Sequence, residues 1–125
     1  MTIRDEFRFL CQIQGKAPHY TQISVTVEKM PEAAGKSELT LAFSHADDDH
    51  PAVRLGALYF FDHYALHYPG GLMLTIRRVQ SMPLGPDNTA VFYATVMALS
   101  QALAFRIGGF ELNMEKGVLS LPFPI

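Results

Sequence analysis

The stretch that decides the fold is residues 51–68, which read PAVRLGALYFFDHYALHY. After the first position only Gly56 disfavours a helix, and the leading Pro51 fits the first turn of one. The stretch is long enough for about five helical turns. Pro69, Gly70 and Gly71 follow at once, and residues of these types end helices. The sequence therefore predicts a helix over residues 51–68.

Four segments around this helix alternate apolar and polar residues with a period of two. This period is typical of a strand with one buried face and one solvent-exposed face. Three of them precede the helix, at residues 7–13, 22–28 and 39–43, and one follows it at residues 72–77. Short loops join the first three segments. Successive amphipathic strands joined in this way favour an antiparallel meander.

A second helix and a hairpin complete the predicted elements. Asp87, Asn88 and Thr89 offer side-chain oxygen atoms that can cap a helix running to about Arg106. Apolar residues, several of them small, share one face of this helix and would let it lie close to its neighbour. They are Val91, Ala94, Ala98, Ala102 and Phe105. In the tail, Gly117 stands between two short alternating runs, a pattern typical of a hairpin.

Together these patterns predict an α+β fold in a single domain, residues 1–125. Its core, residues 7–105, is a two-layer sandwich in which a four-stranded, mainly antiparallel sheet carries both helices on one face. Residues 107–125 form a C-terminal hairpin and tail. A length of 125 residues with 49% hydrophobic and 18% charged residues provides enough apolar surface for one core.

Composition narrows the partners and the compartment. Lys and Arg total 10 against 12 Asp and Glu, a net charge of -2, so nonspecific nucleic-acid binding is disfavoured and no DNA partner is expected. The one cysteine, Cys11, excludes an intrachain disulfide and is expected as a buried thiol on the apolar face of the first strand. The charged N-terminus and the polar residues within 89–105 argue against a signal peptide and a membrane span. A cytoplasmic location without a membrane partner is expected.

The elements follow the order strand, strand, strand, helix, strand, helix. This order resembles domain IV of elongation factor G, whose fold is shared with the second domain of a small-subunit ribosomal protein. The resemblance covers roughly residues 7–105 and implies a left-handed strand, helix, strand crossover, against the usual right-handed rule. It is strongest at three places, which are Ala52, Val53 and Gly56, then Tyr68, Pro69 and Gly70, and finally Asp87, Asn88 and Thr89.

The chain departs from that family where the family meets the ribosome. The loop after the first strand is glycine-rich and basic in the translation factor, whereas residues 15–19 here read GKAPH. The histidine at the tip of the family's loop before the last helix has no counterpart in residues 80–87. No phosphate-binding loop followed by lysine is present in the sequence. Translocation activity is therefore not implied.

An RNA- or ribosome-associated protein is nevertheless one hypothesis, because the resemblance favours it. The candidate contacts combine basic and stacking side chains. They are Lys16, His19, Tyr20 and Arg77. Arg77 and its neighbour Arg78 are predicted to point to opposite faces of a strand, so only one of the two could join a basic patch.

A metal site is a further hypothesis. His63 and His67 are four residues apart on the predicted helix, with Asp62 beside them, which is a spacing that zinc sites use. However, Tyr64 stands where the zinc-protease signature has glutamate, and the sequence specifies no third ligand. A small metal-dependent hydrolase would use these three side chains. The alternative to a metal site is a pair of polar histidines near the solvent-exposed end of a helix, with no cofactor.

Residues 45–50 read HADDDH, so three carboxylates and two imidazoles stand just before the predicted helix. Clustered carboxylates suit hard cations, but the run lacks the spacing and the glycine of a calcium loop. Acidic side chains before a helix are favoured by its dipole and can cap its free N–H groups. Helix capping is therefore the predicted role of Asp47, Asp48 and Asp49.

Apolar residues point in nearly all directions around the first helix, through Tyr59, Phe60, Phe61 and Tyr64. In a two-layer domain each helix keeps one face in water, so some apolar surface is left over and would mark a protein interface. The alternative is that the C-terminal hairpin covers it. These four residues are the interface candidates. The leading hypothesis is a noncatalytic binding or assembly module for a protein partner or a second copy of the chain, with no catalytic residue assigned.

Overall fold

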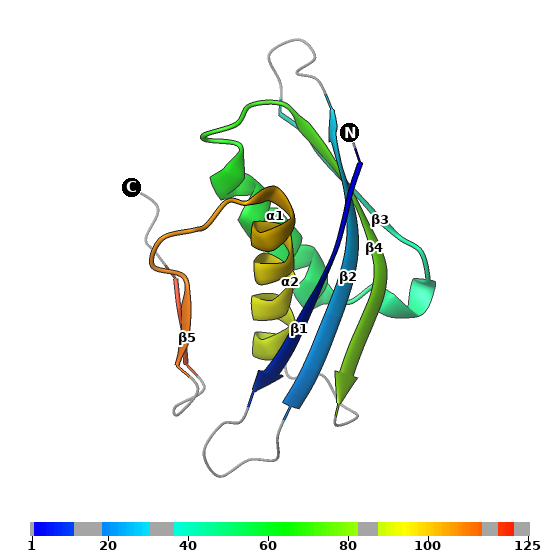
Figure 1. Ribbon diagram of the computed structural model, residues 1–125, viewed down its shortest axis with the longest axis vertical. Helices are drawn as coiled ribbons and strands as arrows, with labels where there is room; N and C mark the ends of the chain where they lie inside the picture. Colours follow the sequence, from blue (N-terminus) through cyan, green and yellow to red (C-terminus); the bar gives the residue numbers. More distant parts are fainter. Residues whose placement is uncertain (1, 12–18, 31–36, 83–87, 114–117, 122–125) are drawn as a thin grey trace.

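The computed structural model describes residues 2–11, 19–30, 37–82, 88–113 and 118–121 (Figure 1). The predicted order of strands and helices is confirmed, and a short 3-10 turn, η1 (Ala46–Asp48), precedes the first helix. The main elements are β1 (Thr2–Cys11), β2 (His19–Met30), β3 (Leu39–Phe43), α1 (Pro51–Tyr64), β4 (Gly71–Met82), α2 (Asn88–Leu103), β5 (Glu111–Asn113) and β6 (Val118–Ser120). The last two strands pair as the predicted C-terminal hairpin.

The main sheet has the strand order β1-β2-β4-β3. The pairs β1 with β2 and β2 with β4 are antiparallel, whereas β3 pairs with β4 in parallel. The prediction of a meander through the first three strands is therefore wrong at β3, because β4 lies between β2 and β3. Alternation along a strand specifies its buried face but not its neighbours, so only contacts between distant segments place β4 at the centre.

Both helices lie on one face of this sheet, as predicted (Figure 1). Because β3 and β4 are parallel neighbours, the chain must cross over between them, and it does so through α1. The crossover is left-handed (Figure 1). Connections of this kind are right-handed in the great majority of folds. This is the rare hand, the one that the resemblance implied.

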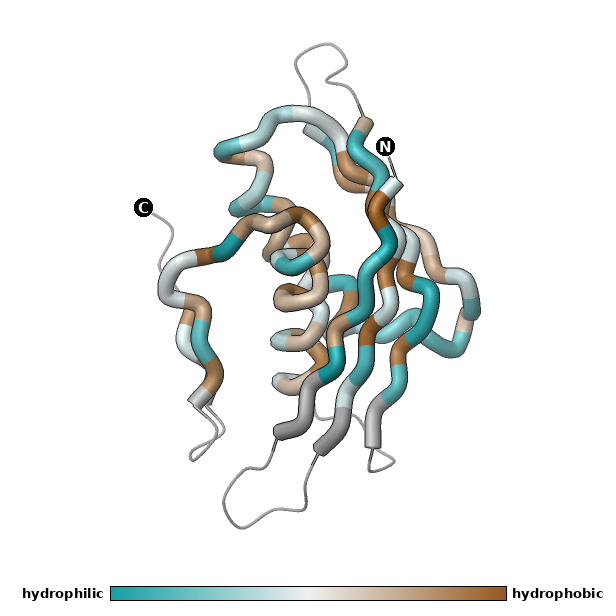
Figure 2. The backbone as a smooth tube through the Cα atoms, viewed as in Figure 1, coloured by the Kyte–Doolittle hydropathy of each residue, from teal (hydrophilic) through white to brown (hydrophobic). Residues whose placement is uncertain are grey.

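The core lies between the sheet and the helices. Six inward apolar side chains of the two central strands are at most 2% exposed, namely Ile23, Val25, Val27, Leu72, Leu74 and Ile76. Figure 2 shows their alternation with polar residues as hydrophobic and hydrophilic bands along the strands. From the helices, Val53, Phe60 and Leu99 are fully buried against this surface. Half-buried Leu119 of β6 also packs against the core.

The two helices approach each other closely at Gly56. A Cβ atom at this position would lie 3.0 Å from Cβ of Thr95 and 3.2 Å from the carbonyl oxygen of Phe92. Thr95 is fully buried, and its hydroxyl donates to the carbonyl of Val91 at 2.8 Å within α2. The helix pair therefore depends on a residue without a side chain in α1 and on a polar group satisfied inside α2.

Helix α1 ends at Tyr64, four residues before the predicted end. The next residues form a turn, and the rings of Tyr64, His67 and Tyr68 gather around Phe105, with ring centroids 5.4, 5.4 and 6.0 Å from it. Gly70 then takes a φ of 128°, a conformation that side chains rarely allow. Packing on a residue beyond α2 thus ends the helix earlier than the local pattern indicates.

Candidate functional site

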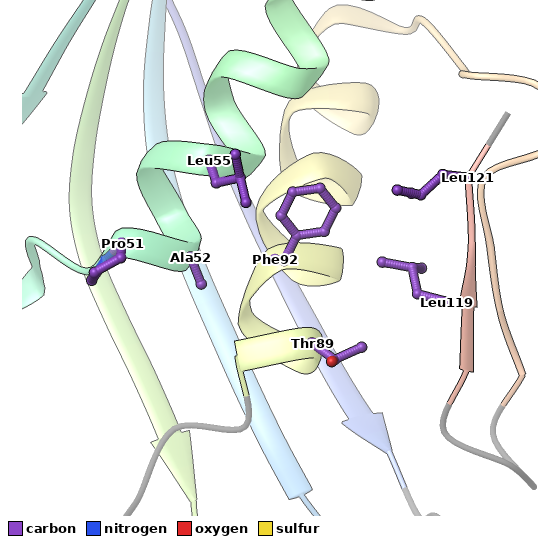
Figure 3. Close-up of a pocket in the computed structure, with 7 residues that line it drawn as sticks. All are labelled: Pro51, Ala52, Leu55, Thr89, Phe92, Leu119 and Leu121. Carbon is purple, nitrogen blue, oxygen red and sulfur yellow. The ribbon is translucent and has the colours of Figure 1, made fainter. Parts of the chain in front are cut away.

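An open groove lies between the two helices and the C-terminal hairpin (Figure 3). Its volume is about 530 Å³. Three elements contribute, since α1 supplies its first turns, α2 its N-terminal turns and the hairpin the region of β6. The lining residues are Pro51, Ala52, Leu55, Thr89, Phe92, Leu119 and Leu121. We refer to this feature as the α1–β6 groove.

The surface of the groove and its surroundings is apolar. Leu55 is 59% exposed and Leu121 is 46% exposed, on opposite walls of the groove (Figure 3). Leu58, one turn after Leu55 on α1, is 50% exposed and extends the surface along the helix. Large apolar side chains on α1 and on the hairpin are thus exposed to water around the groove, and exposed apolar side chains that gather in this way are typical of binding surfaces.

The four predicted interface residues occupy different positions. Phe60, Phe61 and Tyr64 are 0%, 7% and 4% exposed, so they are core residues and present no surface. Tyr59 is half-buried, with its ring 5.6 Å from that of Phe92 and 5.8 Å from that of Phe110. The prediction of surplus apolar surface on α1 holds, but its assignment to Phe60, Phe61 and Tyr64 is wrong, whereas the assignment of half-buried Tyr59 stays a prediction. Large rings contribute most to the core, and α1 directs three of them inward.

Sequence reasoning missed Leu55 and Leu58. A signal for them was present, since both share a helix face with charged Asp62, at the spacing of three and four residues that brings side chains together. A face that carries an ionised side chain is the one that stays in water. Leu66, beyond the helix end and 80% exposed, lies outside the groove.

The three predicted metal ligands do not converge. The ring of His63 packs against Tyr59 at 4.7 Å, whereas the ring of His67 packs against Phe105 at 5.4 Å. Because α1 ends at Tyr64, His67 is not on the helix and the predicted common face is wrong. Among the described residues, no three His, Cys, Asp or Glu side chains are grouped for a metal ion.

The segment before α1 caps the helix through a different residue from those predicted. His50 is the N-cap, and its Nδ1 accepts a hydrogen bond from the backbone N–H of Ala52 at 3.0 Å. Asp49 instead accepts two hydrogen bonds from the guanidinium of Arg54, which also lies 5.1 Å from the ring of Phe43. The three aspartates were predicted to cap, whereas one of them forms an ion pair and a histidine caps.

The ion pair between Asp49 and Arg54 is expected to make the stability of the protein depend on pH. The hydrogen bond from Arg54 lowers the pKa of the Asp49 carboxyl below its ordinary 3.8, with the charge of Arg54 adding to the effect and desolvation opposing it. A depressed carboxyl pKa contributes stability above the unfolded value, and that stability is lost as the pH falls below about 3.8. Arg54→Met is therefore expected to return the Asp49 pKa toward 3.8, as measured by carboxyl NMR titration. An unchanged titration, equal to that of an Arg4→Met control, would contradict the pairing.

The predicted RNA contacts are only partly within the described residues. Lys16 lies outside them, and of His19 and Tyr20 only the strand backbone is described. Arg77 and Arg78 are both exposed, contrary to the prediction of opposite faces. The reason is a β-bulge, because Val25 pairs with Ile76 while Ser24 pairs with Arg78, leaving Arg77 as the extra residue. The Cys11 side chain also lies outside what the structure describes.

No family model matches the chain, and no curated protein matches it. Among solved structures the chain is similar to the crystal structure of 4-(cytidine 5'-diphospho)-2C-methyl-D-erythritol kinase, with 14% identity and a TM-score of 0.31. The similarity covers 81% of this chain and 40% of the kinase chain, so this chain spans less than half the length of that structure. A likeness at this level assigns neither a family nor an activity. Within the described segments, no helix has the length and hydrophobicity to cross a membrane.

Proposed function

We propose that this chain is a noncatalytic protein-binding module whose docking surface is the α1–β6 groove with the adjoining Leu58. The observation that carries the proposal is the exposure of Leu55, Leu58 and Leu121, at 59%, 50% and 46%, around one apolar groove. Leaving these side chains in water costs free energy that a partner recovers by covering them. A partner protein that inserts apolar side chains between α1 and β6 fits this surface.

The chemistry of the groove supports binding over catalysis. Of the seven described residues that line it, Thr89 alone carries a polar side-chain group. No acid, base or imidazole stands in that lining to activate a nucleophile or transfer a proton. The two helical walls are also preformed, since the close contact of Gly56 with Thr95 fixes α1 against α2. A preformed apolar surface loses little conformational entropy on binding.

Two finer proposals accompany this one. Kinship with domain IV of elongation factor G is supported by the element order and by the left-handed crossover through α1. A cytoplasmic location is supported by the single cysteine, which is typical of chains in reducing compartments. Neither proposal changes the role of the groove.

A peptide-display selection tests the groove directly. Peptides enriched on the wild-type protein are expected to lose at least about tenfold in affinity when Leu55 is replaced by glutamate, because a carboxylate would be buried in an apolar contact. Leu66→Glu is the matched control, since the same substitution is made at an 80% exposed leucine outside the groove. Both variants change exposed residues, so stability should stay within about 0.5 kcal/mol of wild type.

Two outcomes would contradict the proposal. One is an enrichment no better than on an unrelated protein. The other is a set of peptides that bind the Leu55→Glu and Leu66→Glu variants equally well. Thermal unfolding of both variants, run alongside, shows whether either has lost the fold.

A further inference from the structure

Strand β1 lies at one end of the main sheet and forms its longer outer edge. It spans ten residues and pairs with β2, whereas β3 at the other end spans five. Among the described residues, no strand pairs with the outer edge of β1. The backbone N–H and C=O groups along such an edge are a template for another strand. The edge of β1 also faces the reader in Figure 1, away from the C-terminal hairpin.

Helix α2 holds β1 in place from the core side. Nε2 of Gln101 donates to Oδ1 of Asp5 at 2.7 Å and to the carbonyl oxygen of Glu6 at 3.2 Å. The Asp5 carboxylate, which points inward from an edge strand, is therefore satisfied within the chain. A carbonyl oxygen has two lone pairs, so the bond to Glu6 still leaves it able to accept from a further strand.

The side chains of β1 alternate in a charged pattern. Arg4, Glu6 and Arg8 are exposed on the outer face of the sheet, and Asp5 and Phe7 are half-buried on the helix face. Directly opposite residues of two antiparallel strands lie on the same face, where like charges repel and opposite charges attract. The charges of β1 therefore disfavour pairing with strands, or in registers, that place like charges opposite each other. They favour pairing with a strand of complementary charge pattern.

A two-fold axis through the edge pairs the central residue of β1 with itself. If the axis passes through Arg4, Asp5, Glu6 or Arg8, a charge meets its own copy. If it passes through Phe7, the phenylalanines meet, and Glu6 of each copy lies opposite Arg8 of the other. Of the centres between residues 4 and 8, the one at Phe7 alone avoids opposing like charges and makes two opposite-charge pairs.

We propose that β1 pairs antiparallel with β1 of a second copy of this chain, centred on Phe7, to form a homodimer with one continuous sheet. In this register residues 3–11 of the two strands overlap, and the helices of both copies lie on the same face. Glu6 and Arg8, already paired within the chain at 2.6 Å, join their copies in a cluster of four charges. The edge of β1 is separate from the α1–β6 groove, so a test of one proposal does not decide the other.

Charge reversal at Glu6 and Arg8 tests the proposed pairing of β1 with its copy, because the single variants and their mixture have opposite expected results. Glu6→Arg places arginine opposite Arg8, and Arg8→Glu places glutamate opposite Glu6, so each variant alone is expected to dimerise at least about tenfold more weakly than wild type. In a mixture of the two variants, every pair is again of opposite charge. The mixture is therefore expected to form a heterodimer, and the double variant Glu6→Arg/Arg8→Glu a homodimer.

Light scattering with mass determination, on full-length chains at matched concentration and low salt, gives the readout. The expected masses are twice 13.9 kDa for the wild type, the double variant and the mixture, and nearer 13.9 kDa for each single variant. Recovery in the mixture shows that the single variants are folded. A monomeric wild type, single variants as dimeric as wild type, or a mixture no more dimeric than its components would each overturn the proposal. Leu55→Glu is expected to leave the dimer intact.

Discussion

Replacing Phe60 by alanine is expected to lower the free energy of unfolding by about 3–5 kcal/mol. Phe60 is 0% exposed at the inner face of α1. Its ring stacks on Tyr64 at 5.6 Å and meets Phe105 edge-on at 5.9 Å, so truncation leaves a cavity and removes two aromatic contacts. Because α1 also connects β3 to β4, the loss affects the whole cooperative unit.

Urea denaturation followed by circular dichroism measures this change. Leu58→Ala is the matched control, because it shortens an apolar side chain on the same helix at a position that is 50% exposed. Its effect should stay within roughly 0.5 kcal/mol, as for surface positions in general. Equal effects at Phe60 and Leu58 would mean that Phe60 does not lie on the buried face of α1.

The second large effect is expected at Gly56. A leucine there would drive its side chain into Thr95 and the backbone of Phe92, where even a Cβ atom lies within 3.0 and 3.2 Å of other atoms. Forcing the helices apart is expected to cost about 1–3 kcal/mol or more, although leucine favours a helix over glycine by nearly 1 kcal/mol. The steric term therefore outweighs the gain in helix propensity.

Thermal and urea unfolding of three variants check this prediction. Gly108→Leu is the control, because a Cβ atom at Gly108 meets nothing within 4 Å. Adding Thr95→Ala to Gly56→Leu should recover part of the loss, since it removes the Cγ2 atom 3.2 Å away but keeps the Cβ atom at 3.0 Å. A Gly56→Leu variant as stable as Gly108→Leu would refute the close helix contact.

Much of the fold follows from patterns within short segments. The period of two in β2 and β4 identified the residues that line the core, and every one of Ile23, Val25, Leu74 and Ile76 is fully buried. The leading Pro51 marked the observed start of α1, and the proline and glycine residues that follow the aromatic stretch placed its end within four residues of Tyr64. These features depend on contacts between residues a few positions apart. The periodicity of the sequence predicts such contacts directly.

The candidate site was harder to predict. The surplus of apolar residues on α1 was visible, but which of them stay in water depends on the elements that pack against α1, among them α2, which approaches it closely at Gly56 and Thr95. Leu55 and Leu58 are exposed, whereas Phe60 and Tyr64 are buried. The second wall of the groove comes from Leu119 and Leu121, more than 60 residues further along the chain.

Local sequence patterns were thus sufficient for the types and order of the elements, the buried faces of β2 and β4, and the C-terminal hairpin. Contacts between distant segments decided the place of β4 between β2 and β3, the early end of α1 on Phe105, the bulge at Arg77 and the groove between α1 and β6. The physical reason is the distance along the chain between the residues that make each contact. Periodicity records which side of an element avoids water, but its partner on that side is chosen by packing the whole chain around one core.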